Sequence, residues 1–595
     1  MNTYVLIDVS QKQQYIYRSD KLKDNLYYSA IIKVVTESFK DEEEGGILPA
    51  FIKEQDTVNL NQFLSQSFKE GKATYEIKYS GGGNSIICFS KEDVADTFIQ
   101  QYSYLVLKDY PELELYISKV NKRILNDSKL DYYTIRKYLY AQIDILKDQR
   151  RAQFKRWTYG VEEIDETGKA VLASKVFKEQ GGETAEEKEK SKRQYELARQ
   201  LINDRLRSKL SGSKKDGNVK LTSELQSYNK NKSNLKDDDS TELNSKSYIA
   251  VIAIDGNMMG KMVEQIKNFR QLKTFSKVIE NIYAKSVALA LEDEAKEKGD
   301  TSTKLYATPV VLSGDDICII TPAEHGISIA AKIVKNIELA LNKNMASTFF
   351  ENSKDFEDLQ GIMVQADIPH LTACAGVCIA KVTYPFFELV RKAEALCEQA
   401  KAHIPRLVSD QPDVSIELNK DSVTESDGQL SKKKVDRSAS LIQWEIVQGQ
   451  IMNRYHYEED AQQQAVYQIT PLRIDQDKPL CCHVMNDNPT KEVEMISYQA
   501  FERIVKQIQQ NQDDLISKST IEEIKKKMYL GWESYDQAFK EKVTSVDKLN
   551  EIITKVFPES DQYEVESATL KMTNTNKRIY VLNDIFEVIP FITMQ

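Results

Sequence analysis

The segments Tyr248-Ile-Ala-Val-Ile-Ala-Ile-Asp-Gly-Asn-Met-Met-Gly-Lys261 and Val310-Val-Leu-Ser-Gly-Asp-Asp-Ile-Cys-Ile-Ile320 carry the main structural signal of this chain. Each is an apolar run rich in β-branched residues, which is typical of a buried strand. Asp255 ends the first strand, and Ser313-Gly314 predicts a hairpin turn that carries Asp315-Asp316. Adjacent strands would gather these carboxylates at one sheet edge, where divalent cations are needed to offset their repulsion. The pattern therefore predicts a site for two metal ions, Mg²⁺ or Mn²⁺, holding a nucleotide triphosphate.

The same residues also permit a simpler interpretation. Carboxylates beside glycine are ordinary turn residues, and Gly-Asp-Asp alone is typical of a solvated loop. Two features favour the metal site: the strand-like flanks, and a hairpin of similar form earlier in the chain, Gly82-Gly-Asn-Ser-Ile-Ile-Cys-Phe89.

Composition limits the classes of protein that remain. The chain has 595 residues, 41% hydrophobic and 29% charged, which suits about three or four soluble globular domains. The net charge of −10 argues against a protein that coats nucleic acid non-specifically. No apolar run is long enough for a membrane helix, and the N-terminus lacks the pattern of a signal peptide. Seven cysteines without a Cys-x-x-Cys pair indicate a reducing, cytoplasmic environment.

The order of expected elements divides the chain into four parts. Residues 1–125 and 246–405 each read as strand, helix, strand, strand, helix, strand, the order of a ferredoxin-like domain. Residues 126–245 are expected to be a charged helical insert and linker, and residues 406–595 a linker followed by a mainly helical domain. The polar stretches 211–247 and 405–438 read as linkers or mobile loops. The predicted fold class is therefore α+β, with two ferredoxin-like domains and helical middle and C-terminal regions.

Only the second of the two units keeps the acidic pair. Asn84 and Ser85 stand where the first unit would carry it, if Gly82–Phe89 is aligned with Ser313–Ile320. Two copies of one fold with one acidic hairpin suggest a pseudo-dimer, in which one copy activates a nucleotide and the other presents an acceptor.

This combination resembles the large two-palm polymerase/cyclase subunit of type III CRISPR–Cas effector complexes, nearer the Cmr-type branch. The resemblance runs from the first strand to about His403 and is carried by six motifs, at 7–16, 79–84, 253–261, 312–316, 371–381 and 393–401. It implies a metal-dependent nucleotidyltransferase in which an acceptor 3′-hydroxyl attacks the α-phosphate of ATP and pyrophosphate leaves. Repetition and ring closure would give cyclic oligoadenylate, an antiviral second messenger.

The resemblance also implies partners and a second possible product. Relatives act beside other effector subunits and respond when target RNA pairs with crRNA, so RNA is expected to be held through the complex. Some relatives join AMP to S-adenosylmethionine by the same chemistry, which stays open here. Two further function classes also stay open: a catalytically inactive scaffold subunit and a standalone signalling cyclase.

Three departures from the family pattern matter. Ser313 replaces the first glycine of the usual Gly-Gly-Asp-Asp hairpin, and it would be strained only if that position needed a positive φ; we expect retained activity. The chain starts at the palm and its five histidines form no His-Asp doublet, so we expect no HD-type DNase. Residues 121–247 contain no cysteine, so the zinc ribbon of many relatives is expected to be lost, with the segment from Trp157 to Gly168 as its remnant.

The site residues follow from these motifs. Three are expected to bind metal and to be catalytic: Asp255, Asp315 and Asp316. Six are expected to contact ATP: Ser313, Gly314, Gly256, Asn257, Lys261 and Lys401. Seven in the first unit are expected to meet the acceptor: Asp8, Ser10, Gly81, Gly82, Gly83, Asn84 and Ser85. Simpler roles also fit some of them: surface lysines for Lys261 and Lys401, a turn cap for Asn257, and a structural cap for Asp8. A cationic acceptor would want an acidic residue in the first unit, for which Asp8, Asp20 and Glu76 are available.

Overall fold

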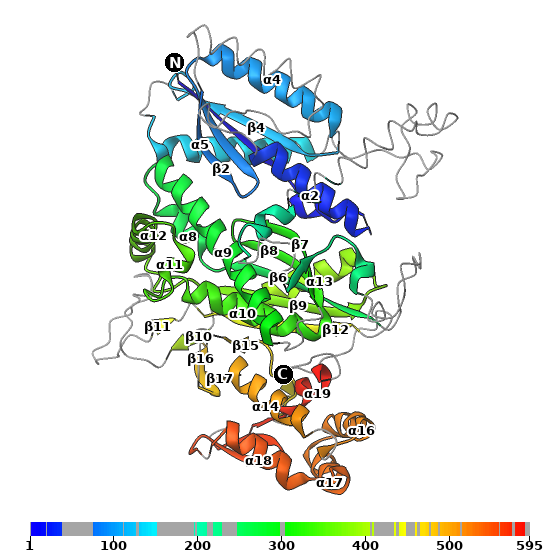
Figure 1. Cartoon of the computed structure of the whole chain (residues 1–595). Coiled ribbons are helices and arrows are strands. Elements are labelled where there is room, and N and C mark those ends of the chain that lie inside the picture. Colours follow the sequence, from blue (N-terminus) through cyan, green and yellow to red (C-terminus); the bar gives the residue numbers. More distant parts are fainter. Residues whose placement is uncertain are drawn as a thin grey trace, which may run out of the picture.

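The computed structural model describes residues 2–19, 21–37, 75–110, 112–125, 130–151, 196, 199–200, 202–210, 218–228, 247–297, 304–404, 407–409, 434–435, 439–447, 459–460, 465–474, 478–485, 488–511, 515–558, 560–573 and 577–589. Three parts follow one another along the long axis of the molecule (Figure 1). The first palm lies at one end, the second palm in the middle and the C-terminal region at the other end.

The first palm is a four-stranded sheet in the order β2-β3-β1-β4. Its elements are β1 (Thr3–Val9), α1 (Lys12–Ile16), α2 (Leu22–Glu37), β2 (Tyr75–Gly81), β3 (Asn84–Phe89), α4 (Glu92–Asp109), β4 (Leu115–Val120) and α5 (Tyr132–Arg151). Alternation along β1 separates two cores: Val5 and Ile7 pack with α2 and α4, whereas Leu6 packs with α5.

The second palm repeats this plan inside a larger, seven-stranded sheet, in the order β15-β12-β9-β6-β8-β7-β5. Its elements are β5 (Val219–Leu221), β6 (Tyr248–Gly256), α8 (Met259–Glu264), α9 (Phe269–Glu297), β7 (Leu305–Ser313), β8 (Asp316–Pro322), α10 (Ala323–Leu339), α11 (Ala346–Phe349), α12 (Ser353–Gln365), β9 (Ala373–Lys381), α13 (Phe386–His403), β12 (Leu441–Val447) and β15 (Leu472–Arg473). Helices α9 and α10 cover one face, and α13 with α2 of the first palm covers the other. The predicted fold class is confirmed.

The two palms match residue for residue at their hairpins. Each second strand has a register shift, between Ile77 and Tyr79 in β2 and between Pro309 and Val311 in β7. Each turn has two residues, flanked by the pairs Gly81↔Asn84 and Ser313↔Asp316. The alignment made from the sequence was therefore wrong by one residue, because Gly81, and not Gly82, is the counterpart of Ser313.

Helix α2 joins the palms because it has two apolar faces. Ile31 and Val35 pack into the first palm, whereas Leu26 and Ala30 pack into the core of the second. Ser29 Oγ donates a hydrogen bond of 2.9 Å to the carbonyl of Val310. Val310 is the residue skipped at the β7 register shift, so the first palm satisfies a carbonyl that the bulge sets apart from the ladder.

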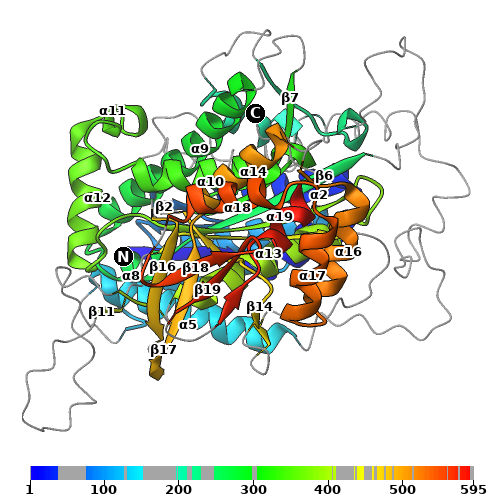
Figure 2. The ribbon, with the colours of Figure 1, turned by 90° about the horizontal axis from the view of Figure 1, so that it is seen from below.

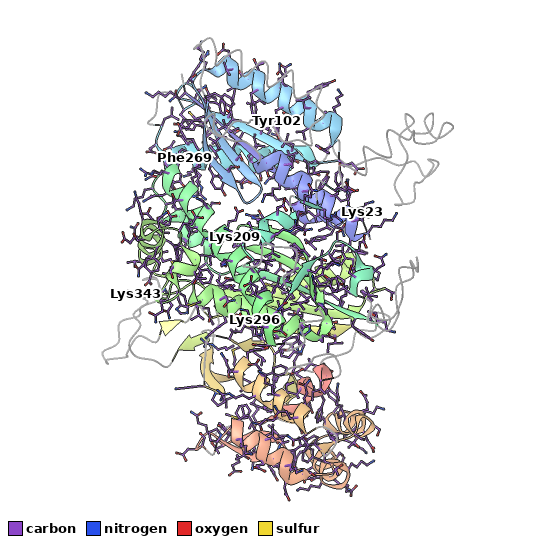
Figure 3. All side chains as sticks on the ribbon, in the orientation of Figure 1. Lys23, Tyr102, Lys209, Phe269, Lys296 and Lys343 are labelled. Carbon is purple, nitrogen blue, oxygen red and sulfur yellow. The ribbon has the colours of Figure 1, made fainter. Side chains whose placement is uncertain are left out.

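The reciprocal contact uses helix α9, which lies against the β2–β3 hairpin of the first palm. Phe269, at the start of α9, lies at the junction of the two palms (Figure 3). Its ring stacks on Tyr4 with 5.8 Å between centroids and meets Tyr132 edge-on at 4.9 Å. Each palm therefore lends its first long helix to the hairpin of the other, as in an isologous dimer.

The C-terminal region is mixed rather than purely helical. Two further sheets have the orders β11-β10-β16-β17 and β13-β14-β20-β19-β18. Their strands are β10 (Leu407–Ser409), β11 (Lys434–Val435), β13 (Glu459–Asp460), β14 (Ala465–Val466), β16 (Leu480–Met485), β17 (Asn488–Ile496), β18 (Tyr563–Glu566), β19 (Thr569–Met572) and β20 (Arg578–Ile579). The helices are α14 (Tyr498–Gln510), α16 (Lys518–Met528), α17 (Trp532–Lys542), α18 (Val546–Val556) and α19 (Leu582–Val588), which lie in front in the view of Figure 2.

The sheets cross the predicted domain limits. Helix α5, placed in the 126–245 insert, covers the first palm, and β5 from the same insert extends the second. Strand β12, placed in the 406–595 region, pairs with β9 in parallel. Strands that join the edge of a sheet pair with segments far away in the sequence, so the local composition of the chain could not predict these domain limits.

Some predictions concern residues that lie outside the described part of the chain. The 157–168 remnant and Asp20 lie outside the described residues, as do most of the 211–247 and 405–438 stretches. The absence of an HD nuclease and of a zinc ribbon stays a prediction. None of the helices in the described part of the chain is both long and apolar enough to span a bilayer.

Candidate functional site

A cavity lies between the two palms and encloses about 1150 Å³, including solvent at its mouth. The first palm contributes residues of α1, α2 and the Gly82–Gly83 turn, and the second contributes β6, β7, β8 and α13. The polar and charged side chains of its wall are Lys12, Gln13, Tyr17, Ser29, Lys33, Arg205, Asp255, Ser313, Asp316, Glu394 and Glu398. We call this space the palm cavity.

Two of the three predicted metal ligands lie in the palm cavity. Asp255 is near the end of β6, and Asp316 begins β8. The β6–β8 register runs to Ile254↔Ile317, so one further step brings Asp255 level with Asp316 on the same face of the sheet. Both side chains line the cavity wall.

Asp315 lies on the other side of the hairpin tip. It lines a second space of about 710 Å³, which we call the rear chamber and which is bounded mainly by α8, α9 and residues of the first palm. Its wall includes Tyr79, Gly82, Arg136, Tyr140, Met259, Val263, Leu272, Phe275, Ser276, Ile279 and Gly314. Gly82 borders both spaces, so the two hairpin tips meet where the palm cavity and the rear chamber adjoin.

The carboxylates repel one another at this edge. Desolvation by burial, together with the negative charge of Asp255, raises the pKa of Asp315 to about 6. Removal of water and the charges of Asp315 and Asp255 raise the pKa of Asp316 to about 7, although its side chain reaches solvent at the recessed cavity wall. The site therefore holds more negative charge than its own cations offset.

Lys401 provides part of the missing positive charge. Its Nζ donates to Asp255 Oδ2 and, at 2.8 Å, to the carbonyl of Gly256. Lys401 lies in α13, which packs so closely on β9 that a β-carbon at Gly376 would overlap the Ala393 carbonyl. Lys401 is thus held on the Asp255 carboxylate, whereas the sequence predicted that it contacts ATP.

The acidic hairpin has the backbone that the sequence suggested. Gly314 has φ +60°, and Asp315 is not among the positive-φ residues, as in a type II′ turn that starts with glycine. Ser313 also has a negative φ. Serine in place of glycine therefore costs no backbone strain at this position.

Three more of the predicted ATP contacts line neither space. Asn257 is buried and donates from Nδ2 to Thr372 Oγ1 and to the carbonyl of Ala439, both at 3.1 Å. It ties β6 to neighbouring segments and caps no helix. Lys261 lies in α8 and lines neither space, and Gly256 is buried. The prediction that Asn257 contacts ATP is therefore wrong, because its buried side chain is engaged with Thr372 and Ala439.

The glycine-rich turn of the first palm divides between two roles. Gly82 and Gly83, with φ +60° and +76°, form a tight turn at the palm cavity. A β-carbon at Gly81 would lie 2.5 Å from Ser276 Oγ of α9, so Gly81 allows the palms to approach each other. The sequence predicted that the backbone at Gly81 approaches a ligand closely. In the structure it instead approaches Ser276 of the second palm.

The prediction that Ser85 meets the acceptor is also wrong. It is fully buried, and its hydroxyl donates to the carbonyl of Thr36 in α2. The one-residue error in the hairpin alignment explains this, because Ser85 matches the core residue Ile317 and Asn84 matches Asp316. Asn84 stays near the surface, where its Oδ1 accepts from Tyr140 at 3.5 Å.

Asp8 is the first-palm counterpart of Asp255. It pairs with Asn84 in the β1–β3 register, just as Asp255 stands level with Asp316. Lys147 Nζ of α5 lies 2.7 Å from its Oδ2, and Lys12 Nζ lies 3.4 Å from its Oδ1. Lysines thus neutralise the carboxylate of this palm. Asp8 and Ser10 are buried and line neither space. Glu76 is paired with Lys78, so neither Asp8 nor Glu76 offers a free carboxylate to a cationic acceptor.

The donor set suits a hard divalent cation in one respect and not in another. It consists of carboxylate oxygens with raised pKa values, which such a cation would neutralise. Among the described residues, however, no three His, Cys, Asp or Glu side chains are grouped to hold one ion. Mg²⁺ is usually bound by one or two carboxylates with water and substrate phosphates completing the shell, so the arrangement fits Mg²⁺ without a protein cage.

Several cavity residues were not found from the sequence. Lys12 follows the first strand, and Glu394 and Glu398 lie one turn apart on α13, facing the same cavity as Asp316. Burial and the charges of Asp316 and Glu398 raise the pKa of Glu394 to about 7. The spacing of Glu394, Glu398 and Lys401 on one helix face was the available signal.

Residues 248–406 match the family model described as Cas10/Cmr2, second palm domain. The chain carries a Cas10/Cmr2 second palm. The match covers the acidic hairpin, the β6 carboxylate and Lys401, and it confirms the resemblance drawn from the motifs. No curated protein matches the chain.

Solved structures add a distant likeness. The apo Csm1–Csm4 cassette has 13% identity and a TM-score of 0.38, with 68% of this chain and 53% of that chain covered. The cassette in complex with cA4 has 12% identity and a TM-score of 0.37, and the complex with one ATP has 12% and 0.38, over the same shares of both chains. The chain thus spans about half the length of the solved structures it matches.

Proposed function

We propose that this chain is a metal-dependent nucleotidyltransferase that transfers AMP from ATP to a ribose 3′-hydroxyl and releases pyrophosphate. With another adenylate as acceptor, repeated transfer and ring closure give cyclic oligoadenylate. The observation that carries this proposal is the palm cavity, because Asp255 and Asp316 line one wall and the Gly82–Gly83 turn of the degenerate palm lines the opposite one.

The chemistry needs few protein groups. The 3′-oxygen forms a bond to the α-phosphorus, the bond from that phosphorus to the bridging oxygen breaks, and the hydroxyl proton passes to water. Divalent ions held by Asp255, Asp315 and Asp316 would neutralise phosphate charge and lower the pKa of the attacking hydroxyl. Lys401 keeps Asp255 oriented through its hydrogen bond to Oδ2.

The two spaces suit two substrates. The palm cavity and the rear chamber adjoin at the hairpin tips, so a donor and an acceptor can lie on opposite sides of Asp315-Asp316. Lys12 extends from the first palm to the cavity wall, where it lies 3.0 Å from the carbonyl of Gly82 and can contact a phosphate. Holding both reactants in place supplies much of the acceleration expected for phosphoryl-type transfer.

The cellular role belongs to the same proposal. We place the chain in a type III CRISPR–Cas effector complex, with other effector subunits, crRNA and target RNA as partners and target pairing as the trigger. The Cas10/Cmr2 palm supports this placement. The acidic net charge of −10 is compatible with it if other subunits hold most of the RNA.

One observation favours a second candidate acceptor. Glu394 and Glu398 face the palm cavity, and burial together with the charges of Asp316 and Glu398 raises the pKa of Glu394 to about 7. A cationic acceptor such as S-adenosylmethionine would supply a compensating positive charge. Condensation of ATP with S-adenosylmethionine is therefore the second candidate reaction.

Product analysis tests both candidates. The protein, alone and with guide and target RNA, is incubated with ATP and Mg²⁺ or Mn²⁺, with and without S-adenosylmethionine, and the products are identified by mass spectrometry. Cyclic oligoadenylate supports the first candidate, and a sulfur-containing adduct supports the second. Product without RNA indicates a standalone enzyme, and no product in any mixture indicates a scaffold subunit.

A double substitution tests the site itself. Asp315→Asn with Asp316→Asn is expected to abolish product, at least about 10³-fold, because charge stabilisation at the phosphates is lost. Asp358→Asn, an exposed aspartate of α12, is the matched control and should leave the rate unchanged. Equal yield from the double variant and the control would refute the assignment.

A further inference from the structure

Tyr283 brings a hydroxyl group to the acidic edge from the opposite face of the sheet. It belongs to α9, is fully buried, and its ring is part of the core beneath β6. The hydroxyl oxygen lies so near Gly256 that a β-carbon at that position would overlap it. Gly256 directly follows Asp255, so the hydroxyl reaches the place where the catalytic strand ends.

This hydroxyl differs from those of Tyr102 and Tyr228, two other buried tyrosines, although the hydroxyls of Tyr17, Tyr132 and Tyr498 also have no partner among the described residues. Within the described residues, Tyr283 Oη is buried and has no hydrogen-bond partner. By contrast, Tyr102 donates to the carbonyl of Val35 at 2.6 Å, and Tyr228 donates to the carbonyl of Ile320 at 3.1 Å. A buried tyrosine hydroxyl usually finds a partner, and an unmet one costs folding free energy.

Met259 and the proposed metal ligand Asp315 lie close to the hydroxyl. The β-carbon position at Gly256 that overlaps the hydroxyl is also 2.6 Å from Met259 Cε and 3.1 Å from Asp315 Cβ. Burial and the negative charges of Asp315, Asp255 and Asp316 raise the pKa of Tyr283 well above its ordinary value. A phenol, with an ordinary pKa of about 10, keeps its proton at neutral pH and can act only as a donor toward an ionised carboxylate.

We propose that Tyr283 is a positioning residue whose hydroxyl donates a hydrogen bond to the Asp315 carboxylate when that carboxylate binds a divalent ion. The inference rests on the proposed function. Residues that hold a metal-binding carboxylate from behind set its orientation, and their loss typically weakens metal binding about 10- to 100-fold. Glycine at position 256 has a physical reason under this proposal, because any side chain there would displace the hydroxyl.

The test is Tyr283→Phe, which removes one oxygen and keeps the ring. Because the hydroxyl makes no hydrogen bond in the metal-free protein, the melting temperature without metal should be equal to or above that of the wild type. Mn²⁺ binding, measured by titration calorimetry and by the electron paramagnetic resonance of free Mn²⁺, should be about tenfold weaker or more. The Mn²⁺ concentration for half-maximal product should rise by a similar factor, while KM for ATP at saturating Mn²⁺ stays close to the wild-type value.

Tyr228→Phe is the matched control. It removes a hydroxyl that bonds Thr308 and Ile320 on the far side of the same sheet, so it should lower the melting temperature and leave Mn²⁺ affinity unchanged. Unchanged Mn²⁺ affinity in Tyr283→Phe, whatever its melting temperature, would overturn the positioning role. Failure of the wild-type protein to bind Mn²⁺ or to make product would overturn the proposed function itself, and the two failures are separated by the wild-type measurement.

Discussion

Asp316 shows how much of this site depends on single side chains. It lies level with Asp255 on one face of the sheet, and the adjacent Asp315 lies across the hairpin tip in another space. Asn84, its counterpart in the first palm, carries no charge, and Lys12 and Lys147 neutralise the carboxylate of Asp8. The two palms thus solve the same electrostatic problem in different ways, with lysines in one and, we propose, metal ions in the other.

The raised pKa of Asp316 leads to a prediction for stability against pH. Its folded pKa of about 7 is above the ordinary value of 3.8, so the folded state binds the proton more tightly than the unfolded state does. This group therefore lowers the free energy of unfolding as pH rises from about 4 to about 7. Urea denaturation in EDTA should show Asp316→Asn gaining stability relative to the wild type between about pH 5 and pH 7.5.

Addition of Mg²⁺ provides the control for that prediction. A bound cation favours the ionised carboxylate, so the wild type should regain stability at about pH 7.5 while Asp316→Asn gains less. Parallel stability curves for the two proteins, with and without Mg²⁺, would contradict the assigned repulsion.

Among the helices and strands, close packing of α13 on the sheet fixes Lys401. Helix α13 lies directly on β9 because Gly376 has no side chain: a β-carbon there would lie 2.5 Å from the backbone nitrogen of Cys397. The same helix presents Glu394, Glu398 and Lys401 to one side. Any displacement of α13 therefore changes the charge of the cavity wall and the support of Asp255.

Gly376→Ala is expected to lift α13 from the sheet. The overlap should cost about 1–3 kcal/mol of unfolding free energy. Product formation should fall by more than that loss of stability explains, because Lys401 moves away from Asp255. Denaturation and initial rates measured on the same samples check both effects.

Gly361→Ala is the matched control for this substitution. Gly361 lies inside α12 and a β-carbon there meets no atom within 4 Å, so the change should stabilise the protein by about 0.5–1 kcal/mol and leave the rate unaltered. A Gly376→Ala variant that behaves like Gly361→Ala would refute the packing argument.

Across the molecule as a whole, a buried polar cluster joins α9 and α10 where the second palm shares its core with α14 of the C-terminal region. Glu294 of α9 accepts from Ser328 and Lys332 of α10, at 2.7 Å and 2.6 Å, and contacts His325 Nδ1 at 2.8 Å. Tyr498 of α14 is buried beside this cluster, and its pKa is raised by burial and by the charges of Glu502 and Glu294.

Glu294 gives this junction a dependence on acid. Burial alone would raise its pKa, but the hydrogen bond from His325 and the charge and hydrogen bond of Lys332 lower it to about 2. Its stabilising contribution, about 3 kcal/mol, is therefore complete above about pH 4.5 and is lost as pH falls toward about 2.

Chemical denaturation of Glu294→Gln measures that contribution. The stability difference from the wild type should be largest at about pH 6 and should shrink at about pH 3. The exposed Glu357→Gln of α12 serves as the control and should show no such change. A difference that is independent of pH would exclude an ionised Glu294 as its source.

Local patterns along the chain were enough to define the two ferredoxin-like units, their strands and hairpins, and the three carboxylates at one edge, because strand periodicity and turn chemistry are local properties. They misplaced Ser85 and Asn257, since a one-residue change of register reverses the face of a strand residue and burial depends on distant partners. Folding in three dimensions was needed to show that Asp315 and Asp316 border different spaces, that Lys401 binds Asp255, and that Tyr283 reaches Gly256. These relations arise where one palm packs against the other and where helices pack on a sheet. They depend on contacts between segments far apart in the sequence, which the pattern within one segment does not determine.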